Sequence, residues 1–296
     1  MFPCSFSVDV EDGVSIAMRD KFGKIVPQTE RVVVNTRKIL HLLERFNVKG
    51  TFFILGKVSE DFPFLIKEIA DGGHELAIHG YNHLKFSQMT PAEAREELMS
   101  AKKHIEDLTG KQVYGHRAPA FSIFPGTSWA FELLIECGFT YDSSIMPIKG
   151  FHYGWPGFPE EIVNVKVDSS QSIFEVPLPV IKTFNMNIPF SGGSYLRLFP
   201  FPFTKHGFNN QVKKGPAILY IHPYELDFVR YPDYFFEEMK KQPFLSRLKT
   251  RSNWVNRRGV EDKLTKLLAA FHYKTILEIL TEARENSIIP DFNISK

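Results

Sequence analysis

Segments with the hydrophobic pattern of a strand alternate along the chain with segments that have the pattern of a helix. Short runs rich in β-branched and aromatic residues predict strands, and most are followed by a segment with apolar residues at the three- to four-residue spacing of a helix. The seven expected strands span residues 4–10, 50–55, 74–79, 112–119, 138–144, 172–180 and 217–223. Alternation of this kind predicts an α/β protein with a parallel sheet, either open or closed into a barrel.

The predicted helix with the clearest boundaries covers residues 90–110. Thr90 is suited to cap this helix, and Pro91 to occupy its first turn. Glu93 completes a capping box, and Gly110 is suited to end the helix.

Polar side chains that can bind a metal ion or transfer a proton lie at the ends of the predicted strands. They are Asp9 and Asp12 after the first strand, His79 after the third, Arg117 in the fourth, Asp142 in the fifth and His222 in the last. Because the carboxyl ends of parallel strands open on one face, we expect these side chains to converge there.

The stretch IHGYNHLKF, residues 78–86, places His79 and His83 four residues apart. On a helical turn such a pair points one way, which suits two imidazoles bound to one Zn²⁺. The spacing alone is equally compatible with two surface histidines. The carboxylates expected at the same face favour a metal site.

Composition limits the classes of function. The chain has 296 residues, of which 43% are hydrophobic, enough for a large core. Its 36 basic and 34 acidic side chains leave a net charge of +2, which gives no electrostatic case for binding nucleic acid. Its two cysteines, Cys4 and Cys137, indicate no disulfide framework and exclude a zinc site built from several cysteines.

The N-terminus MFPCSFSVDVEDG lacks the basic head and long apolar run of a signal peptide. No run approaches 18 uninterrupted apolar residues, so we expect no transmembrane segment. We therefore expect a cytoplasmic protein with one domain over residues 1–296, in which residues 223–296 form a helical extension packed on the rest.

Several motifs, in order, resemble those of a known family. The segments SFSVDVEDG, HGYNH, HRAP and YIHPYELD are similar to the motifs of the polysaccharide deacetylases, the NodB-homology or carbohydrate esterase family 4 enzymes. GGSYLRL (192–198) and LLAAFHYKTILEIL (267–280) resemble a subgroup from exopolysaccharide and O-antigen gene clusters. The resemblance covers nearly the whole chain and implies a distorted (β/α) barrel with about seven parallel strands.

The resemblance also implies a metal site and a base. Enzymes of this family hold one divalent metal ion, usually Zn²⁺ with Co²⁺, Ni²⁺ or Mn²⁺ as alternatives, through one Asp and two His. The corresponding residues here are Asp12, His79 and His83. Asp9 is implied as the base that takes a proton from the attacking water, and Arg117 as the residue that keeps this carboxylate charged.

Two further roles follow from the same resemblance. His222 is implied as the general acid that protonates the departing amine. The backbone N–H of Ala120, after the Arg-x-Pro motif, is implied as a donor that helps to stabilise the oxyanion.

One departure from the family pattern concerns the carboxylate ligand. The common motif has two adjacent aspartates, whereas this chain reads Asp9-Val10-Glu11-Asp12. On an extended strand Asp9 and Glu11 share a face, and Asp12 points the other way unless the strand has ended. Gly13 suggests a turn that frees Asp12 to swing inward. We assign Asp12 as the ligand and keep Glu11 as the alternative.

Three further features have two interpretations each. Asp142 in YDSS could bind a sugar hydroxyl or cap the following turn. Trp155 in YGWPGFP could stack on a sugar ring or be buried among its neighbours. The basic segment 239–259 could contact an anionic membrane surface weakly or form a solvated helical face.

The motif order predicts a metal-dependent enzyme that removes an N-acetyl group from a sugar in surface-polysaccharide biosynthesis. Its substrate could be nucleotide-linked, lipid-linked or polymeric. A deformylase or another amide hydrolase on a related sugar or small amide is the alternative among enzymes. The rival from another class is a catalytically silent glycan-binding protein. The evidence against it is that none of the expected catalytic positions carries an inert residue.

Overall fold

The computed structural model describes residues 1–150, 153–183, 186–251, 254–286 and 289–294. Nine strands in these residues form the main sheet, in the order β10-β1-β2-β3-β4-β5-β7-β6-β11. Their bounds are β1 Cys4–Val10, β2 Thr51–Ile54, β3 Glu75–Ile78, β4 Gly115–His116, β5 Tyr141–Asp142, β6 Val163–Lys166, β7 Ser172–Glu175, β10 Ala217–Ile221 and β11 Asp291–Asn293. Neighbouring strands are parallel except β6 and β7.

Each of the seven predicted strands contains a strand of this sheet, although β4 and β5 are only two residues long. The hydrophobic pattern does not predict β6, β11 or the separate antiparallel pair of β8 (Val180–Thr183) and β9 (Met186–Pro189).

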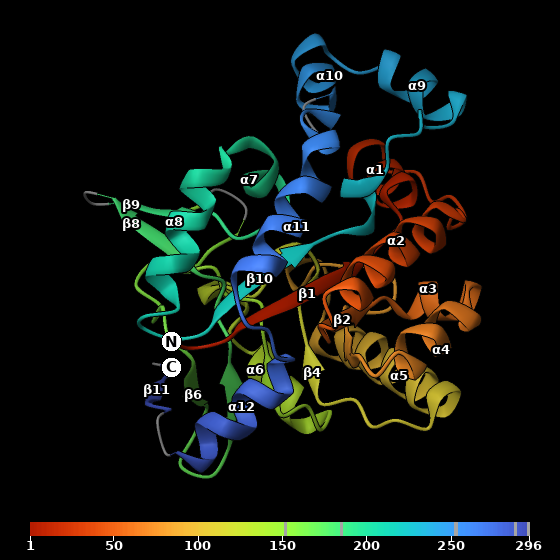
Figure 1. The fold of residues 1–296 in the computed structure, drawn as a ribbon. Helices are drawn as coiled ribbons and strands as arrows, with labels where there is room; N and C mark the ends of the chain where they lie inside the picture. The colour runs from red at the N-terminus through yellow and green to blue at the C-terminus, as the bar shows by residue number, and fades with distance from the viewer. Residues whose placement is uncertain (151–152, 184–185, 252–253, 287–288, 295–296) are drawn as a thin grey trace.

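The α-helices of the described residues lie around the sheet (Figure 1). Their bounds are α1 Gly13–Phe22, α2 Arg31–Arg45, α3 Gly56–Asp61, α4 Pro63–Asp71, α5 Pro91–Thr109, α6 Ala130–Glu136, α7 Gly193–Leu198, α8 Phe201–Gln211, α9 Asp233–Lys240, α10 Phe244–Arg251, α11 Val260–Ala270 and α12 Ile276–Glu285. The predicted caps of α5 are confirmed, because Thr90 and Glu93 form a capping box and Gly110 ends the helix with a φ of 66°. None of these helices is both long and apolar enough to cross a membrane.

The outer face of the sheet packs against the surrounding helices. On β1, Phe6 and Val8 point to this face and join a core with Ile39 of α2, Leu65 of α4 and Leu98 of α5. Since side chains alternate along a strand, the residues between them point to the opposite face. That face encloses a core of its own.

The inner core contains Phe53, Tyr141 and Ile218 from three strands, together with Ile276 and Ile279 of α12. Helices therefore cover the outer face, and the inner face surrounds an interior that α12 closes. This arrangement is a distorted barrel, as the resemblance implied, and not an open sheet with helices on both faces.

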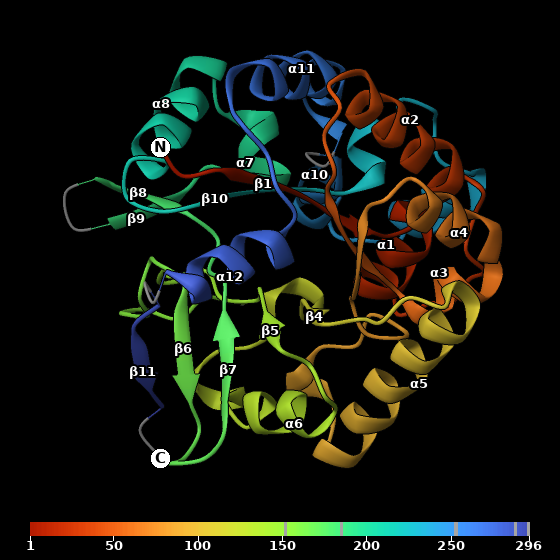
Figure 2. The ribbon, with the colours of Figure 1, turned by 60° about the horizontal axis from the view of Figure 1, so that its bottom comes forward.

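Helix α12 closes the end of the barrel at which β2 and β3 begin. The Ile276 N–H donates to the Thr51 hydroxyl at 2.9 Å, and the Leu277 N–H donates to a Glu75 carboxylate oxygen at 3.1 Å. Figure 2, in which the bottom of Figure 1 comes forward, shows α12 across this end. The carboxyl ends of the strands are thereby left for a site.

The closure by α12 gives a testable stability difference. We expect Ile276→Ala to lower the free energy of unfolding by about 2–5 kcal/mol, because Ile276 is fully buried and its loss leaves a cavity. Ile25→Ala is the matched control, since Ile25 is 92% exposed and its truncation should change stability by less than about 0.5 kcal/mol. Urea unfolding followed by circular dichroism measures both. An equal change in the free energy of unfolding for both variants would contradict the role of α12 in closing the barrel.

Candidate active site

The first strand brings two carboxylates to the interior and sends a third elsewhere. Asp9 and Glu11 lie on the same face, and both are buried. Asp12 instead caps α1, where its carboxylate accepts hydrogen bonds from the N–H groups of Val14 and Ser15.

The Asp12 carboxylate also accepts from the Thr29 N–H at 2.7 Å and the Thr29 hydroxyl at 3.0 Å. These bonds turn Asp12 away from the two histidines. The expected assignment of Asp12 as a ligand is therefore corrected, and the alternative, Glu11, occupies that place.

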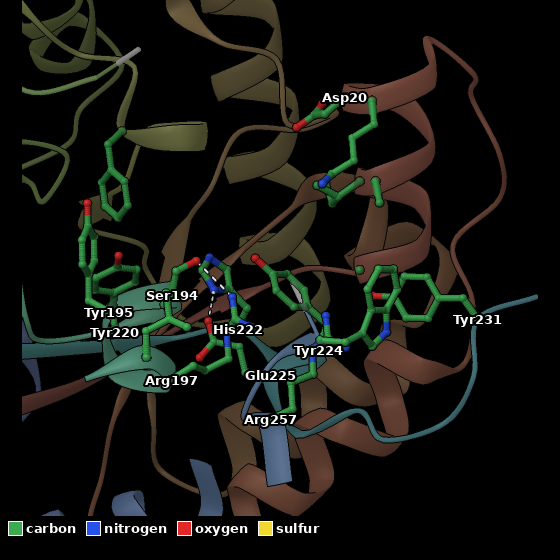
Figure 3. Close-up of a pocket in the computed structure, with 18 of the residues that line it drawn as sticks. Asp20, Ser194, Tyr195, Arg197, Tyr220, His222, Tyr224, Glu225, Tyr231 and Arg257 are labelled. Carbon is green, nitrogen blue, oxygen red and sulfur yellow. Dashed lines mark hydrogen bonds and ion pairs between the residues drawn. The ribbon is translucent and has the colours of Figure 1, made fainter. Parts of the chain in front are cut away.

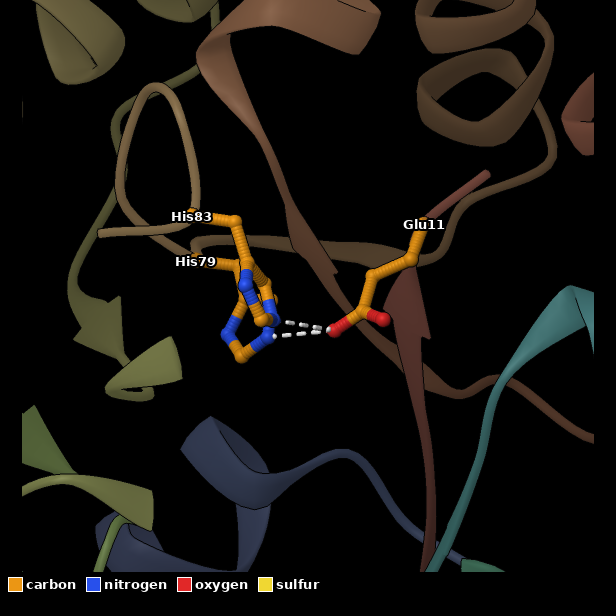
Figure 4. A group of neighbouring side chains, drawn as sticks. All are labelled: Glu11, His79 and His83. Carbon is orange, nitrogen blue, oxygen red and sulfur yellow. Dashed lines mark hydrogen bonds and ion pairs between the residues drawn. The ribbon is translucent and has the colours of Figure 1, made fainter. Parts of the chain in front are cut away.

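Glu11, His79 and His83 form a buried cluster at the carboxyl ends of β1 and β3 (Figure 4). The Nε2 atoms of His79 and His83 lie 2.9 and 3.0 Å from the same oxygen of Glu11. One ligand atom from each residue lies within 4.8 Å of the others. His83 is held in this position by a left-handed backbone conformation with a φ of 59°, a strained geometry for a residue other than glycine.

The chemistry of this cluster fits a divalent metal ion. His79 Nδ1 donates to the Arg117 carbonyl at 2.8 Å, while its Nε2 faces the Glu11 carboxylate. Both ring nitrogens thus face acceptors, so a cation, either a proton or a metal ion, is needed between Nε2 and Glu11. The bond to a backbone carbonyl at Nδ1 is the support that metal-binding histidines usually have.

His83 has a different neighbour at its second ring nitrogen. An Arg19 N–H lies 2.7 Å from His83 Nδ1, so Nδ1 accepts and Nε2 carries the proton toward Glu11. If Nε2 binds a metal ion, the proton of the neutral ring is on Nδ1. Arg19 cannot accept a hydrogen bond from that N–H, because a guanidinium only donates. Metal binding by His83 therefore requires Arg19 to move.

The surroundings of Glu11 favour its charged form. Burial alone raises the pKa of this carboxyl, but the charge of His222 and the hydrogen bonds from His79 and His83 outweigh burial. They hold the pKa of Glu11 well below its usual range. A charged carboxylate beside two imidazoles is a donor set that zinc and similar ions accept.

Asp9 lies between a guanidinium and an imidazole. One oxygen accepts from Arg117 at 2.8 Å, and the other lies 3.7 Å from His222 Nε2. The structure therefore brings together the three residues expected to act in proton transfer, Asp9, Arg117 and His222, next to the Glu11 cluster.

Arg117 is fully buried inside the barrel. Its guanidinium also donates to the Ser7 hydroxyl at 2.9 Å and to the carbonyl and hydroxyl of Ser143, both at 2.9 Å. The guanidinium carbon lies 4.0 Å from the centre of the Phe53 ring. These contacts fix the plane of the guanidinium and hence the orientation of Asp9.

His222 is held by two residues of the turn that follows β10. Its Nδ1 donates to Glu225 at 3.1 Å, and the Tyr224 ring stacks on it with centroids 4.7 Å apart. Burial lowers the pKa of His222, but Glu11, Glu225 and Asp9 together outweigh burial and raise the pKa to about 9. A protonated imidazole is the form that can donate to a departing amine.

A cleft of about 360 Å³ opens beside His222 (Figure 3). Seven of its nineteen lining residues are aromatic, namely Phe121, Tyr153, Tyr195, Tyr220, Tyr224, Tyr231 and Trp254. Ser194, Arg197 and Glu225 add polar groups. Aromatic faces with a few polar groups suit a ligand that has both apolar and hydroxyl-bearing sides.

The loop after β4 has an unusual backbone. Ala120 and Phe121 both have a φ of 53°, so two successive residues other than glycine lie in the left-handed region. Ala120 is half-buried, and Phe121 lines the cleft. Strain of this kind persists where the surroundings fix it, often at functional sites.

Two residues expected to bind substrate have other roles. Asp142 is fully buried and accepts from His116 Nδ1 and the Ser144 hydroxyl, both at 2.7 Å, and from the Ser144 N–H at 3.1 Å. The assignment of Asp142 to a sugar hydroxyl is corrected to the alternative, a turn cap.

Trp155 is not one of the described residues that line the cleft. Its ring packs on Phe158 and Phe131 with centroids 5.3 and 6.4 Å away. The assignment of Trp155 to sugar stacking is likewise corrected to its alternative, packing among neighbouring side chains.

Three residues of the site are not predicted from the sequence, namely Glu225, Ser143 and Arg19. Glu225 lies three residues after His222 in the quoted motif, and that spacing could have indicated a partner for the imidazole. Ser143 and Arg19 reach the site from other elements, and no local pattern marks them.

Two family models match separate parts of the chain. Residues 27–140 match a model described as polysaccharide deacetylase, and residues 143–281 match one described as a domain of unknown function, DUF3473. The first range contains His79, His83 and Arg117, and the second contains His222.

Two curated relatives are similar to part of the chain. A peptidoglycan deacetylase-like protein of Gibberella zeae is 34% identical over 149 residues, which cover 49% of this chain and 43% of the relative. A peptidoglycan deacetylase of Helicobacter pylori is 35% identical over 113 residues, 38% of each chain. The matches thus span less than half of these relatives.

Solved structures share the fold over nearly the whole chain. A candidate polysaccharide deacetylase from Mycobacterium smegmatis has a TM-score of 0.60 at 20% identity. The match covers 98% of this chain and 96% of the mycobacterial chain. Puue allantoinase has a TM-score of 0.56 at 18% identity, and the match covers 96% of this chain and 91% of the allantoinase chain. At these identities the likeness shows the fold alone.

The cluster predicts which substitutions remove a metal ion. We expect wild-type protein supplied with Zn²⁺ to retain about one ion per chain, and Glu11→Gln and His83→Ala to lose it, since each removes one of three protein ligands. Asp12→Asn is the control, because asparagine still caps α1 and Asp12 lies outside the cluster.

Elemental analysis after gel filtration measures the metal content of each protein. Retention by Glu11→Gln together with loss in Asp12→Asn would restore Asp12 as the ligand.

Proposed function

We propose that this chain is a metal-dependent polysaccharide deacetylase of the NodB-homology type, which removes the N-acetyl group from an aminosugar of a surface polysaccharide. The observation that carries the proposal is the Glu11–His79–His83 cluster beside the Asp9–Arg117 pair and His222. The match of residues 27–140 to the polysaccharide deacetylase model supports it.

The residues divide the hydrolysis of an amide between them. Glu11, His79 and His83 would hold the metal ion, which would supply Lewis-acid polarisation of the acetyl carbonyl and make water more acidic. Asp9 accepts a proton as water adds to the carbonyl carbon. Arg117 holds Asp9 in place, because its guanidinium donates to one carboxylate oxygen at 2.8 Å.

His222 completes the reaction from the other side of the site. Its protonated Nε2 supplies the proton that the sugar nitrogen needs as the C–N bond breaks, which leaves acetate and a free amine. Glu225 and Tyr224 hold the ring in the position from which it can donate. The backbone N–H of Ala120 is the proposed donor to the oxyanion, and its left-handed conformation sets the direction of that N–H.

We also assign the chain to the subgroup from exopolysaccharide and O-antigen loci. The subgroup motif GGSYLRL forms α7, and five residues from Gly193 to Leu198 line the cleft beside His222. A motif of this kind at the wall of the cleft is expected to contact the substrate. The named activity of the relatives on peptidoglycan supports an N-acetylated aminosugar as the substrate class.

The decisive experiment is acetate release by the metal-loaded protein. Purified protein is incubated with N-acetylglucosamine oligomers, peptidoglycan fragments and N-acetylated exopolysaccharide, and acetate is measured enzymatically. N-formylated sugars and allantoin are tested in parallel, because a related amide hydrolase would act on these instead. Binding of glycans without hydrolysis, in protein with full metal content, would make the chain a glycan-binding protein.

Asp9 separates catalysis from metal binding. We expect Asp9→Asn to lower kcat by about 100- to 10,000-fold, because it removes the general base. Its metal content should be unchanged, since Asp9 lies outside the ligand cluster. Asp107→Asn, a change at an exposed carboxylate on α5, is the matched control and should keep full activity.

Acetate release and elemental analysis are measured on the same preparations. Normal kcat in Asp9→Asn would exclude Asp9 as the base, and loss of metal would make Asp9 a ligand.

A further inference from the structure

Helix α10 exposes apolar side chains that the rest of the fold does not cover. Phe244 is 63% exposed, Leu245 77% and Leu248 46%, all within two turns of one helix. Figure 1 shows α9 and α10 at the opposite end of the molecule from α12, beyond α1 and α7. Solvent-exposed apolar groups that gather in this way usually mark a contact surface.

Basic residues neighbour these apolar residues in the sequence. Residues 239–251 contain five basic side chains and no acidic one, so the rest of the chain carries 31 basic and 34 acidic side chains. The net positive charge of the protein is therefore concentrated at this end. The carboxylates that precede this segment in the sequence are on α9, where Glu238 is paired with Lys24 and Lys241.

We propose that this end of the molecule binds an anionic lipid bilayer surface. The binding surface, here the α10 surface, consists of Lys240, Lys241, Phe244, Leu245, Leu248 and Arg251. Exposed phenylalanine and leucine side chains enter the boundary between headgroups and acyl chains, while lysine and arginine contact anionic headgroups. The charge of the surface, with its exposed apolar groups, fits this partner better than a second copy of the chain, which is basic at the same place.

The α10 surface is connected to the cleft beside His222. The segment after α10 supplies Trp254 and Arg257 to the cleft wall. Arg197 of α7 donates to the Val255 carbonyl at 3.0 Å, and Leu198, 53% exposed, lies at the rim of the cleft. A bilayer at the α10 surface therefore lies near the cleft.

The position of the cleft has a consequence for the substrate, and this step rests on the proposed function. A sugar attached to a lipid carrier can reach a cleft beside the membrane without leaving the bilayer. Membrane binding itself does not depend on activity, so the two ideas can fail separately.

Sedimentation with vesicles tests the proposal. Metal-loaded wild-type protein is expected to bind vesicles of phosphatidylcholine with 30% phosphatidylglycerol and to bind pure phosphatidylcholine at least 10-fold more weakly. Raising the salt concentration from 0.1 to 0.5 M should weaken the binding further. Absence of sedimentation with the anionic vesicles would overturn the proposal.

Two variants and two controls locate the surface. The triple variant Phe244→Ser, Leu245→Ser, Leu248→Ser should bind at least 10-fold more weakly. Its control, Val34→Ser, Phe64→Ser, Met99→Ser, changes side chains that are 53%, 46% and 45% exposed on α2, α4 and α5, and should bind normally.

Charge is tested in the same way. Lys240→Gln with Arg251→Gln should weaken binding about 30-fold, at about 1 kcal/mol per charge. Lys103→Gln with Lys182→Gln, two exposed lysines elsewhere, should not. Unchanged binding in either α10 variant would overturn the proposal.

Two other partners give different results. An acidic polymer is indicated if heparin binds wild-type protein and the triple serine variant equally well, while the charge variant loses binding. A second copy of the chain is indicated if light scattering finds a dimer that the triple serine variant does not form. Either result would replace the membrane as the partner.

Discussion

The buried guanidinium of Arg117 is the group on which the site depends. A charge in the interior of a barrel is strongly unfavourable unless its hydrogen bonds are satisfied. Arg117 meets that requirement through Ser7 and Asp9 of β1 and through Ser143 after β5, with Phe53 against its face. Strands on opposite sides of the interior are thereby tied to one point.

The same residue also orients the metal cluster, through its backbone. The Arg117 carbonyl accepts from His79 Nδ1, which directs Nε2 toward Glu11. One residue thus fixes the proposed base with its side chain and a proposed metal ligand with its carbonyl. Loss of the guanidinium would leave the Asp9 carboxylate buried without its partner, a change that typically costs about 3–5 kcal/mol.

Much of the fold could be predicted because it depends on local periodicity. The caps of α5 and the seven strands follow from patterns within one segment of sequence. The short strands β4 and β5 keep only two paired residues each, since pairing depends on the neighbouring strands and not on propensity. The antiparallel position of β6 is likewise set by its partner β7.

The candidate site could be predicted by residue type but not in every position. Five residues converge because they lie at or after the carboxyl ends of parallel strands, namely Asp9, His79, His83, Arg117 and His222. The choice between Asp12 and Glu11 depends on Thr29, which lies 17 residues from Asp12 and holds its carboxylate with two hydrogen bonds. A long-range contact of this kind leaves no local signal. Asp142 and Trp155 also look like ligand-binding residues until their buried neighbours are known.

Gly13 shows how closely the start of α1 packs against the segment after β10. A Cβ at this position would lie 2.4 Å from the Tyr231 hydroxyl and 2.6 Å from Tyr224 Cβ. Tyr224 in turn stacks on His222. A side chain at residue 13 would therefore displace Tyr224, which supports the proposed acid.

The position of α12 closes one end of the barrel, where Ile276 and Ile279 fill the interior. A ligand of the site therefore enters and leaves at the carboxyl ends of the strands. Under the proposed function, a polymeric substrate could not pass through the barrel. It would lie across the open end with one sugar residue inserted, so each acetyl group along a polymer would be removed in a separate binding event.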